Sequence, residues 1–107
     1  MATIFRVLTP TILSDTVKDG IRHISVNPSE MVCSQQIDIE LDGDTVRRVT
    51  FTGGCAGNTQ GVASLVAGRK VDEACRRLEG IDCHGKGTSC PDQLAQALRY
   101  SLETIRL

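Results

Sequence analysis

The segment between residues 37 and 51 constrains the fold of this chain most strongly, because polar and apolar residues alternate in its first half. The alternating residues are Ile37, Asp38, Ile39, Glu40 and Leu41. A period of two is typical of a strand with one buried face. Asp42-Gly43 is a hairpin turn signal. Val46 and Val49 on the return strand are an odd number of residues apart, so either a bulge lies between them or Val46 faces the other side.

Three segments with helical periodicity follow the hairpin. Gly68 and Gly80 are expected to end the first two helices, and Pro91 suits the first turn of the third. Strands followed by helices predict an α+β fold, with about three helices packed on one face of a small antiparallel sheet. The expected buried residues are Val62, Leu65 and Val66 in the first helix, Val71, Ala74, Cys75 and Leu78 in the second, and Leu94, Leu98, Leu102 (or Ser101) and Ile105 in the third.

The region before residue 28 is less regular. Residues 11–18 fit a helix or a strand equally well, because apolar residues fall at helical spacing but β-forming residues are frequent. Asp19-Gly20 signals a turn, and the residues up to Val26 look extended. We therefore divide the chain into an N-terminal extension over residues 1–27, with an added strand or helix, and a cysteine-rich domain over residues 28–107.

Composition excludes several classes of function. A formal net charge of −1 and an aromatic content of 3% argue against nucleic-acid binding, which needs basic surfaces and stacking side chains. No apolar run approaches the roughly 20 residues of a membrane span, and the first residues lack the apolar core of a signal peptide. We expect a cytoplasmic protein whose partner is another protein. A homo-oligomer is compatible with the sequence.

Five cysteines are many for a chain of 107 residues, and in the reducing cytosol they point to metal or redox chemistry. Cys75 falls on the apolar stripe of its helix, so we expect it in the core. The other four stand in loops at element boundaries, and Cys33 and Cys55 flank the hairpin, which would bring them to the same end. Four thiolates suit Zn²⁺ or an iron–sulfur cluster. The predicted metal ligands are Cys33, Cys55, Cys83 and Cys90.

Other interpretations of these loops remain open. Cys90 would stand at the start of a helix, where the helix dipole favours a negatively charged thiolate. This suits a thiol redox or sulfur-carrier protein in which Cys83 is the resolving partner. His84 could replace a cysteine ligand, although adjacent residues rarely face one metal. The glycine-rich loops before two helices could also bind an anion.

The chain closely resembles the TSCPD domain family. The resemblance rests on four motifs in the family's order and spacing: VCS, GGCAGN, GIDC and TSCPDQLA, from about Glu30 to Leu98. It implies that the four loop cysteines are the family's cysteine set, with Cys75 outside it. Related domains occur at the C-terminus of adenosylcobalamin-dependent ribonucleotide reductases, so an accessory role beside such an enzyme is a second hypothesis. A chain of this length cannot house the reductase's own radical chemistry, and we do not expect an enzyme on its own.

A weaker resemblance is to iron–sulfur scaffold proteins of the IscU/NifU type. They share a cysteine before a hairpin, a glycine-cysteine loop before a helix, and a cysteine before the last helix. The scaffold's Gly-Asp after the first cysteine is Ser34-Gln35 here, and its histidine before the last cysteine is Ser89. This resemblance implies an IscU-like fold. The leading functional hypothesis is thus a small cysteine-ligated metal-binding protein with a structural or a cluster- and sulfur-handling role.

Overall fold

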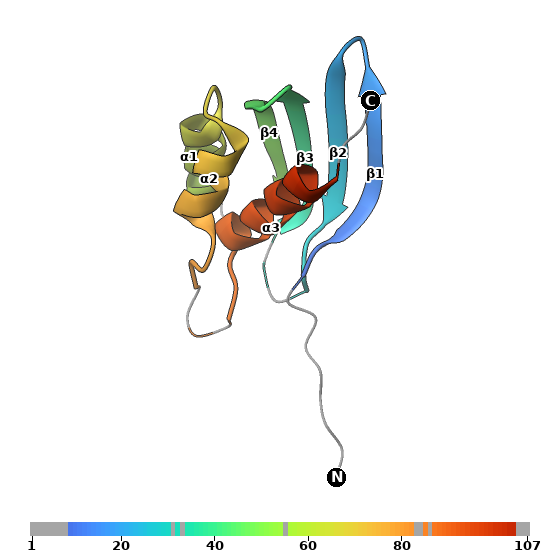
Figure 1. The fold of residues 1–107 in the computed structure, drawn as a ribbon. Helices are drawn as coiled ribbons and strands as arrows, with labels where there is room; N and C mark the ends of the chain where they lie inside the picture. Colours follow the sequence, from blue (N-terminus) through green and yellow to red (C-terminus); the bar gives the residue numbers. More distant parts are fainter. Residues whose placement is uncertain are drawn as a thin grey trace.

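The chain folds into one four-stranded antiparallel sheet and three helices, the α+β class that the sequence predicted (Figure 1). The computed structural model describes residues 9–30, 32, 34–54, 56–82, 85 and 87–104. The strands lie in the sheet in chain order. The elements are β1 (Thr11–Lys18), β2 (Ile21–Asn27), β3 (Ser34–Asp42), β4 (Thr45–Gly53), α1 (Ala56–Val66), α2 (Val71–Leu78) and α3 (Cys90–Glu103).

Residues 11–27 form a hairpin in the same sheet as the predicted one. Asp19 and Gly20 both have positive φ angles, 53° and 79°, as a tight hairpin turn of the primed type requires. This turn pairs β1 with β2, and β2 pairs in turn with β3. Of the two alternatives for residues 11–18, the strand is the one that forms, because the turn directly after them brings β2 alongside as a pairing partner.

A bulge between β3 and β4 resolves the odd spacing of Val46 and Val49. Glu40 pairs with Arg48, whereas the next residue, Leu41, pairs with Val46. The extra residue on β4 turns both valines to the same face of the sheet, and both are buried. The first of the two sequence-based alternatives, a bulge, is confirmed.

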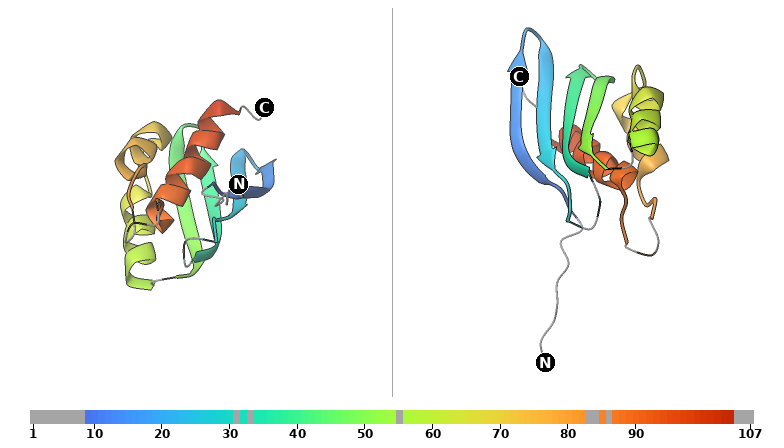
Figure 2. Two further views of the ribbon diagram at one scale, coloured as in Figure 1. Left: turned by 90° about the horizontal axis from the view of Figure 1, so that it is seen from below. Right: turned by 180° about the vertical axis from the view of Figure 1, so that it is seen from behind.

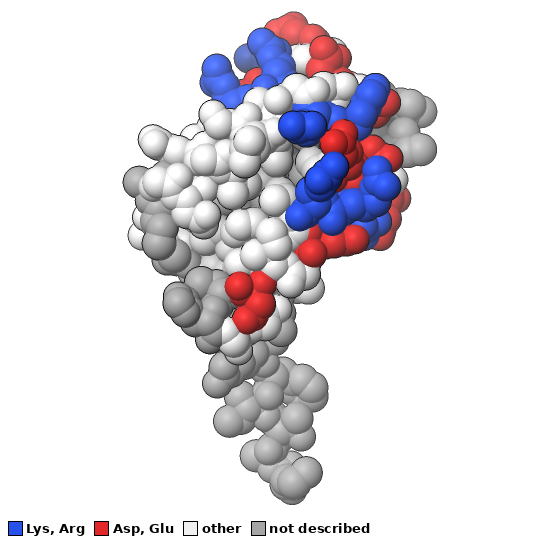
Figure 3. Space-filling model, turned by 90° about the vertical axis from the view of Figure 1, so that its left-hand side faces the viewer, with Lys and Arg blue, Asp and Glu red and all other residues white. Residues whose placement is uncertain are grey.

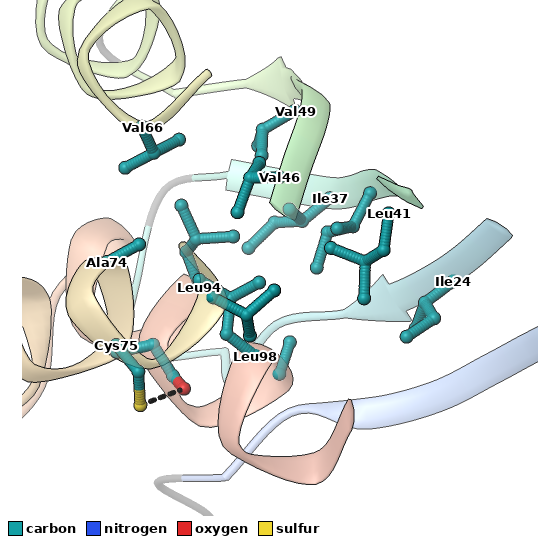
Figure 4. Close-up of a cluster of buried hydrophobic side chains, with 14 of the residues drawn as sticks. Ile24, Ile37, Leu41, Val46, Val49, Val66, Ala74, Cys75, Leu94 and Leu98 are labelled. Atoms are coloured by element: carbon teal, nitrogen blue, oxygen red, sulfur yellow. Dashed lines mark hydrogen bonds between the residues drawn. The ribbon is translucent and has the colours of Figure 1, made fainter. Parts of the chain in front are cut away.

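The core lies between one face of the sheet and the helices. Figures 1 and 2 show α3 crossing this face, with α1 and α2 beside the β4 edge. Figure 4 shows the side chains of the core, to which every strand except the edge strand β1 contributes fully buried residues. The buried core residues are Ile24, Val26, Ile37, Ile39, Leu41, Val46, Val49, Val66, Val71, Ala74, Cys75, Leu94, Ala95, Ala97 and Leu98.

Cys75 is a core residue, as predicted. Its side chain is fully buried on α2, and its thiol donates a hydrogen bond to the carbonyl oxygen of Ala95 on α3, with a sulfur–oxygen distance of 3.3 Å (Figure 4). Burial raises the pKa of Cys75 above its ordinary value, because the thiolate would lose its hydration. Both observations fit a packing role.

Two leucines expected in the core lie at the surface. Leu65 is 69% exposed and Leu102 is 43% exposed. On α1 the inward positions belong to Val62, Ala63 and Val66, and on α3 the inward position is Ser101, the alternative to Leu102. The prediction for Leu65 was wrong because helical spacing alone does not define which edge of a broad apolar stripe meets the sheet.

Charged side chains are unevenly distributed over the helices. Lys, Arg, Asp and Glu side chains gather at one side and at the top of the face seen in Figure 3. The sequence of α2 includes Asp72, Glu73, Arg76 and Arg77, whereas that of α1 contains no charged residue.

Arg22 of β2 fastens the first hairpin to the end of α3. Its guanidinium donates to both carboxylate oxygens of Asp15, at 2.8 and 2.6 Å. It also donates to the carbonyl oxygens of Ser101 and Thr104, each at 3.0 Å. These carbonyls lie at the C-terminus of α3, where helical carbonyls lack partners within the helix. Tyr100 adds a hydrogen bond from its hydroxyl to Asp15 at 2.8 Å.

Candidate functional site

Cys90 is the one predicted metal ligand that lies within the described residues. Cys33, Cys55 and Cys83 lie outside them, as does the alternative ligand His84. Within the described ranges, no group of three or more His, Cys, Asp or Glu side chains is arranged to hold a metal ion. The four-cysteine set therefore stays a prediction. The structure describes Cys90 itself and the residues that are next to the other three cysteines in sequence.

Cys90 is the first residue of α3, as the sequence predicted. Ser89 is the N-cap, and its hydroxyl oxygen accepts a hydrogen bond from the backbone N–H of Asp92 at 3.1 Å. Pro91 follows in the first turn, where a missing N–H costs nothing. The side chain of Cys90 is buried, with 6% of the residue exposed. Its sulfur thus lies beneath the surface at the positive end of the helix dipole.

The open end of the β3–β4 hairpin, where Ser34 pairs with Gly53, lies against Cys90 of α3. Ser34, which follows Cys33 in sequence, is buried, and its hydroxyl donates to the Cys90 sulfur at 3.0 Å. Ser34 pairs with Gly53 across the hairpin. Gly54, which precedes Cys55, lies against Ser34 so closely that a Cβ atom would be 2.9 Å from the serine hydroxyl oxygen. Described neighbours of Cys33 and Cys55 thus meet at the start of α3.

The loop between α2 and α3 is fastened at both of its ends. The carboxylate of Asp82, which precedes Cys83, accepts hydrogen bonds from the backbone N–H groups of Gly85 and Gly87. Both glycines have positive φ angles, which residues with a Cβ atom rarely adopt. The hydroxyl of Ser89 donates to the carbonyl oxygen of Ile81 at 2.6 Å. This bond holds the start of the loop against the N-terminus of α3.

A buried polar network beneath Cys90 connects α3 to this loop. Asp92 accepts hydrogen bonds from the backbone N–H of Gly80 at 2.7 Å and from the hydroxyl of Thr88 at 2.6 Å. It also accepts one from the side-chain amide of Gln96 at 2.9 Å. Asp92 and Thr88 are both buried, so each bond satisfies a group that water reaches poorly.

Gln93 extends the network to the loop before β3. Its side chain is fully buried. The side-chain oxygen of Gln93 accepts a hydrogen bond from the backbone N–H of Ser29 at 2.8 Å. The side-chain NH₂ group donates one to the Thr88 hydroxyl at 2.9 Å. Among the described residues, every buried side-chain nitrogen and oxygen atom has a hydrogen-bond partner. The network thus joins α3 to the segments that lead into Cys33 and Cys83.

Sequence reasoning missed this role of Asp92 and Gln93, which entered the prediction only as part of the TSCPDQLA motif. The sequence carries no local signal for it. Asp92 and Gln96 are four residues apart on the side opposite Leu94 and Leu98, which is the pattern of the solvent-facing side of an amphipathic helix.

A family model matches most of the chain. The TSCPD domain model covers residues 11–102. This chain belongs to the TSCPD domain family. The match begins before residue 28, where we expected the domain to start, so the first hairpin lies within the matched TSCPD span. No curated protein and no solved structure matches the chain. The resemblance to the IscU type therefore stays a prediction.

The TSCPD motif itself corresponds to the buried start of α3. Its members are Thr88, Ser89, Cys90, Pro91 and Asp92. Apart from the cysteine and the proline, each makes a hydrogen bond described above that orders the helix start or the loop before it. In the described part of this TSCPD domain, no helix is long and apolar enough to cross a membrane.

Proposed function

We propose that this TSCPD domain binds Zn²⁺ or an iron–sulfur cluster through Cys33, Cys55, Cys83 and Cys90. The observation that carries the proposal is the environment of Cys90. Its sulfur is buried at a helix N-terminus and accepts a hydrogen bond from Ser34, next to which lies Gly54. These two residues neighbour two of the other cysteines in sequence, so a metal ion at this point would connect segments far apart in the chain.

The donor set fits such a group. Four cysteine sulfurs can satisfy tetrahedral Zn²⁺ or the irons of a cluster, and metal binding releases the thiol protons. Metal binding would supply a strong crosslink or, with an exchangeable position, a means of handling clusters or sulfur. The cysteine loops would then be held on one side by the metal and on the other by the network of Asp92 and Gln93.

The burial of Cys90 favours a ligand over a freely reacting thiol. Cysteines that act in redox exchange are partly exposed, because their sulfur must be attacked in line by another thiol. Cys90 is only 6% exposed, and its sulfur already accepts a hydrogen bond from the Ser34 hydroxyl. The thiol redox alternative thus requires a rearrangement that exposes this sulfur.

A role beside a ribonucleotide reductase is a second candidate, and membership of the TSCPD family is the observation that favours it. It is compatible with the metal site, since a small metal-binding domain can serve a larger enzyme as an accessory. The metal measurement below does not depend on this partner.

Anaerobic purification followed by a visible spectrum and a count of zinc, iron and sulfide per chain tests the proposal. One zinc per colourless chain indicates a closed zinc site, and brown protein with iron and sulfide indicates a cluster. Cys55→Ala should lose the metal, whereas the matched variant Cys75→Ala should retain it. Metal-free protein, or equal metal loss in both variants, would refute the proposed ligand set.

A further inference from the structure

We propose that Ser34 is a positioning residue that donates a hydrogen bond to the metal-bound sulfur of Cys90. This inference rests on the proposed metal site and names a determinant that the cysteine pattern does not contain. Ser34 is 5% exposed, and its hydroxyl oxygen lies 3.0 Å from the Cys90 sulfur. The pair joins the first residue of β3 to the first residue of α3.

The chemistry fixes the direction of this hydrogen bond. A metal-bound cysteine has lost its proton, so its sulfur can only accept, whereas a serine hydroxyl carries one hydrogen to donate. Donation to a charged sulfur is stronger than donation to a neutral one. The bond therefore strengthens when Cys90 becomes a ligand, and it stabilises the negative charge on the sulfur.

Gly54 leaves the space in which the Ser34 hydroxyl lies. A Cβ atom on Gly54 would be 2.9 Å from the hydroxyl oxygen and 3.3 Å from the backbone nitrogen of Ser34. The φ angle of Gly54 is +85°, a conformation that residues with a Cβ atom rarely adopt. Both the backbone at Gly54 and the position of Ser34 thus depend on the missing side chain.

Three separate motifs are explained together by this contact. Ser34 belongs to VCS, Gly54 to GGCAGN and Cys90 to TSCPD. Outer hydrogen bonds of this kind orient metal ligands and adjust how strongly they donate electrons to the metal. Ser34 would accordingly set the affinity and the electronic state of the site, while the four cysteines supply its coordination.

Cobalt substitution makes this effect visible, because Co²⁺ takes the tetrahedral thiolate site of zinc and absorbs visible and near-ultraviolet light. The protein is stripped of metal, loaded with Co²⁺ and titrated against a coloured chelator. In Ser34→Ala the sulfur lone pairs lose their stabilisation. We expect the sulfur-to-cobalt charge-transfer band to move to longer wavelength and the affinity for Co²⁺ to fall about tenfold.

Two further variants separate the hydroxyl from general loss of stability. Ser101→Ala removes a buried hydroxyl at the far end of α3, where it donates to the carbonyl of Leu98, and its band should stay at the wild-type wavelength. Ser34→Thr keeps a hydroxyl, so its charge-transfer band should stay close to the wild-type wavelength.

The outcomes distinguish this inference from the metal proposal itself. If the wild type binds Co²⁺ but Ser34→Ala has an unchanged band and affinity, Ser34 has no such role and the metal site stands. An identical shift in Ser34→Ala and Ser34→Thr would likewise overturn the role of the hydroxyl. If the wild type binds no Co²⁺ and is also free of zinc and iron after anaerobic purification, both proposals fail.

Discussion

Replacing Asp92 with asparagine tests whether the buried network organises the site. The carboxylate accepts from Gly80 through one oxygen and from Thr88 and Gln96 through the other. An asparagine can keep one oxygen toward Gly80, but its NH₂ group then cannot accept the hydrogens that the Thr88 hydroxyl and the Gln96 amide donate to Asp92. The Thr88 bond is lost in a buried environment, whereas Gln96 is only half-buried and can turn to water.

The expected loss of stability is about 3 kcal/mol. A buried hydrogen bond to a charged group contributes about 1.5–3 kcal/mol. Removing a negative charge from the first turn of α3 adds about 0.3–1 kcal/mol through the helix dipole. For a domain of this size, such a loss lowers the melting temperature by about 15 °C. The measurement is urea unfolding of the metal-free protein, followed by chelator competition with the metal-loaded protein.

Asp72→Asn is the matched control, because Asp72 is also an acidic residue in the first turn of a helix but is exposed. It should lose less than about 1 kcal/mol and leave metal affinity unchanged. If Asp92→Asn loses no more than this control, the network is not the support we describe. A large loss of stability with unchanged metal affinity would limit its role to the fold.

Three further changes have distinct expected outcomes. Arg22→Met should cost about 2–4 kcal/mol, because the carboxylate of Asp15, whose side chain is 3% exposed, loses its ion pair with Arg22. Arg48 pairs with Glu40 at the surface, so Arg48→Met should cost less than about 0.5 kcal/mol in urea unfolding. Gly54→Ala should destabilise the protein by about 1–2 kcal/mol more than Gly43→Ala, since both have positive φ but only Gly54 has close neighbours; equal losses in thermal unfolding would contradict the contact with Ser34. Burial raises the pKa of Cys75, so the thiol stays neutral in the folded state after it ionises in the unfolded state, and stability falls as pH rises from about 9 toward the folded pKa. Cys75→Ala should remove this part of the alkaline loss in urea titrations between pH 7 and 10, and an unchanged pH dependence would argue against burial as its cause.

Local patterns were sufficient to predict the central hairpin and the helix ends. The alternation from Ile37 to Leu41 defines β3, and the glycines at 68 and 80 end the helices as predicted. The N-terminal hairpin was ambiguous because residues 11–18 form an edge strand. Such a strand is half exposed, so its apolar residues lack a clean period of two, and its structure depends on pairing with β2.

Loop positions and thiol chemistry select four candidate ligands from the sequence, and that set stays a prediction. The polar support around Cys90 could not be predicted. The hydrogen bonds of Gln93 to Ser29 and of Ser34 to Cys90 join residues far apart in sequence. In the sequence around them, these buried polar residues do not differ from exposed polar residues. Their role could therefore be recognised only from the structure, which shows that they are buried.

The two ends of α3 should contribute independently to stability. Arg22 holds the C-terminus of the helix, and the network of Asp92 lies at its N-terminus. The helix has 14 residues, so about 20 Å separates the two clusters. Sites this far apart without shared partners add within about 0.5 kcal/mol, and the Arg22→Met/Asp92→Asn double variant should lose the sum of the two single losses.

Metal affinity gives the sharper comparison between these ends. Arg22→Met should leave the affinity for Co²⁺ unchanged, because the start of α3 and the ends of β3 and β4 keep their contacts. Asp92→Asn should weaken it about tenfold. A loss of affinity in Arg22→Met, or a coupling energy above about 1 kcal/mol in the double variant, would show that α3 transmits strain along its length. The cysteine site would then depend on the whole sheet and not on the segments that surround Cys90 alone.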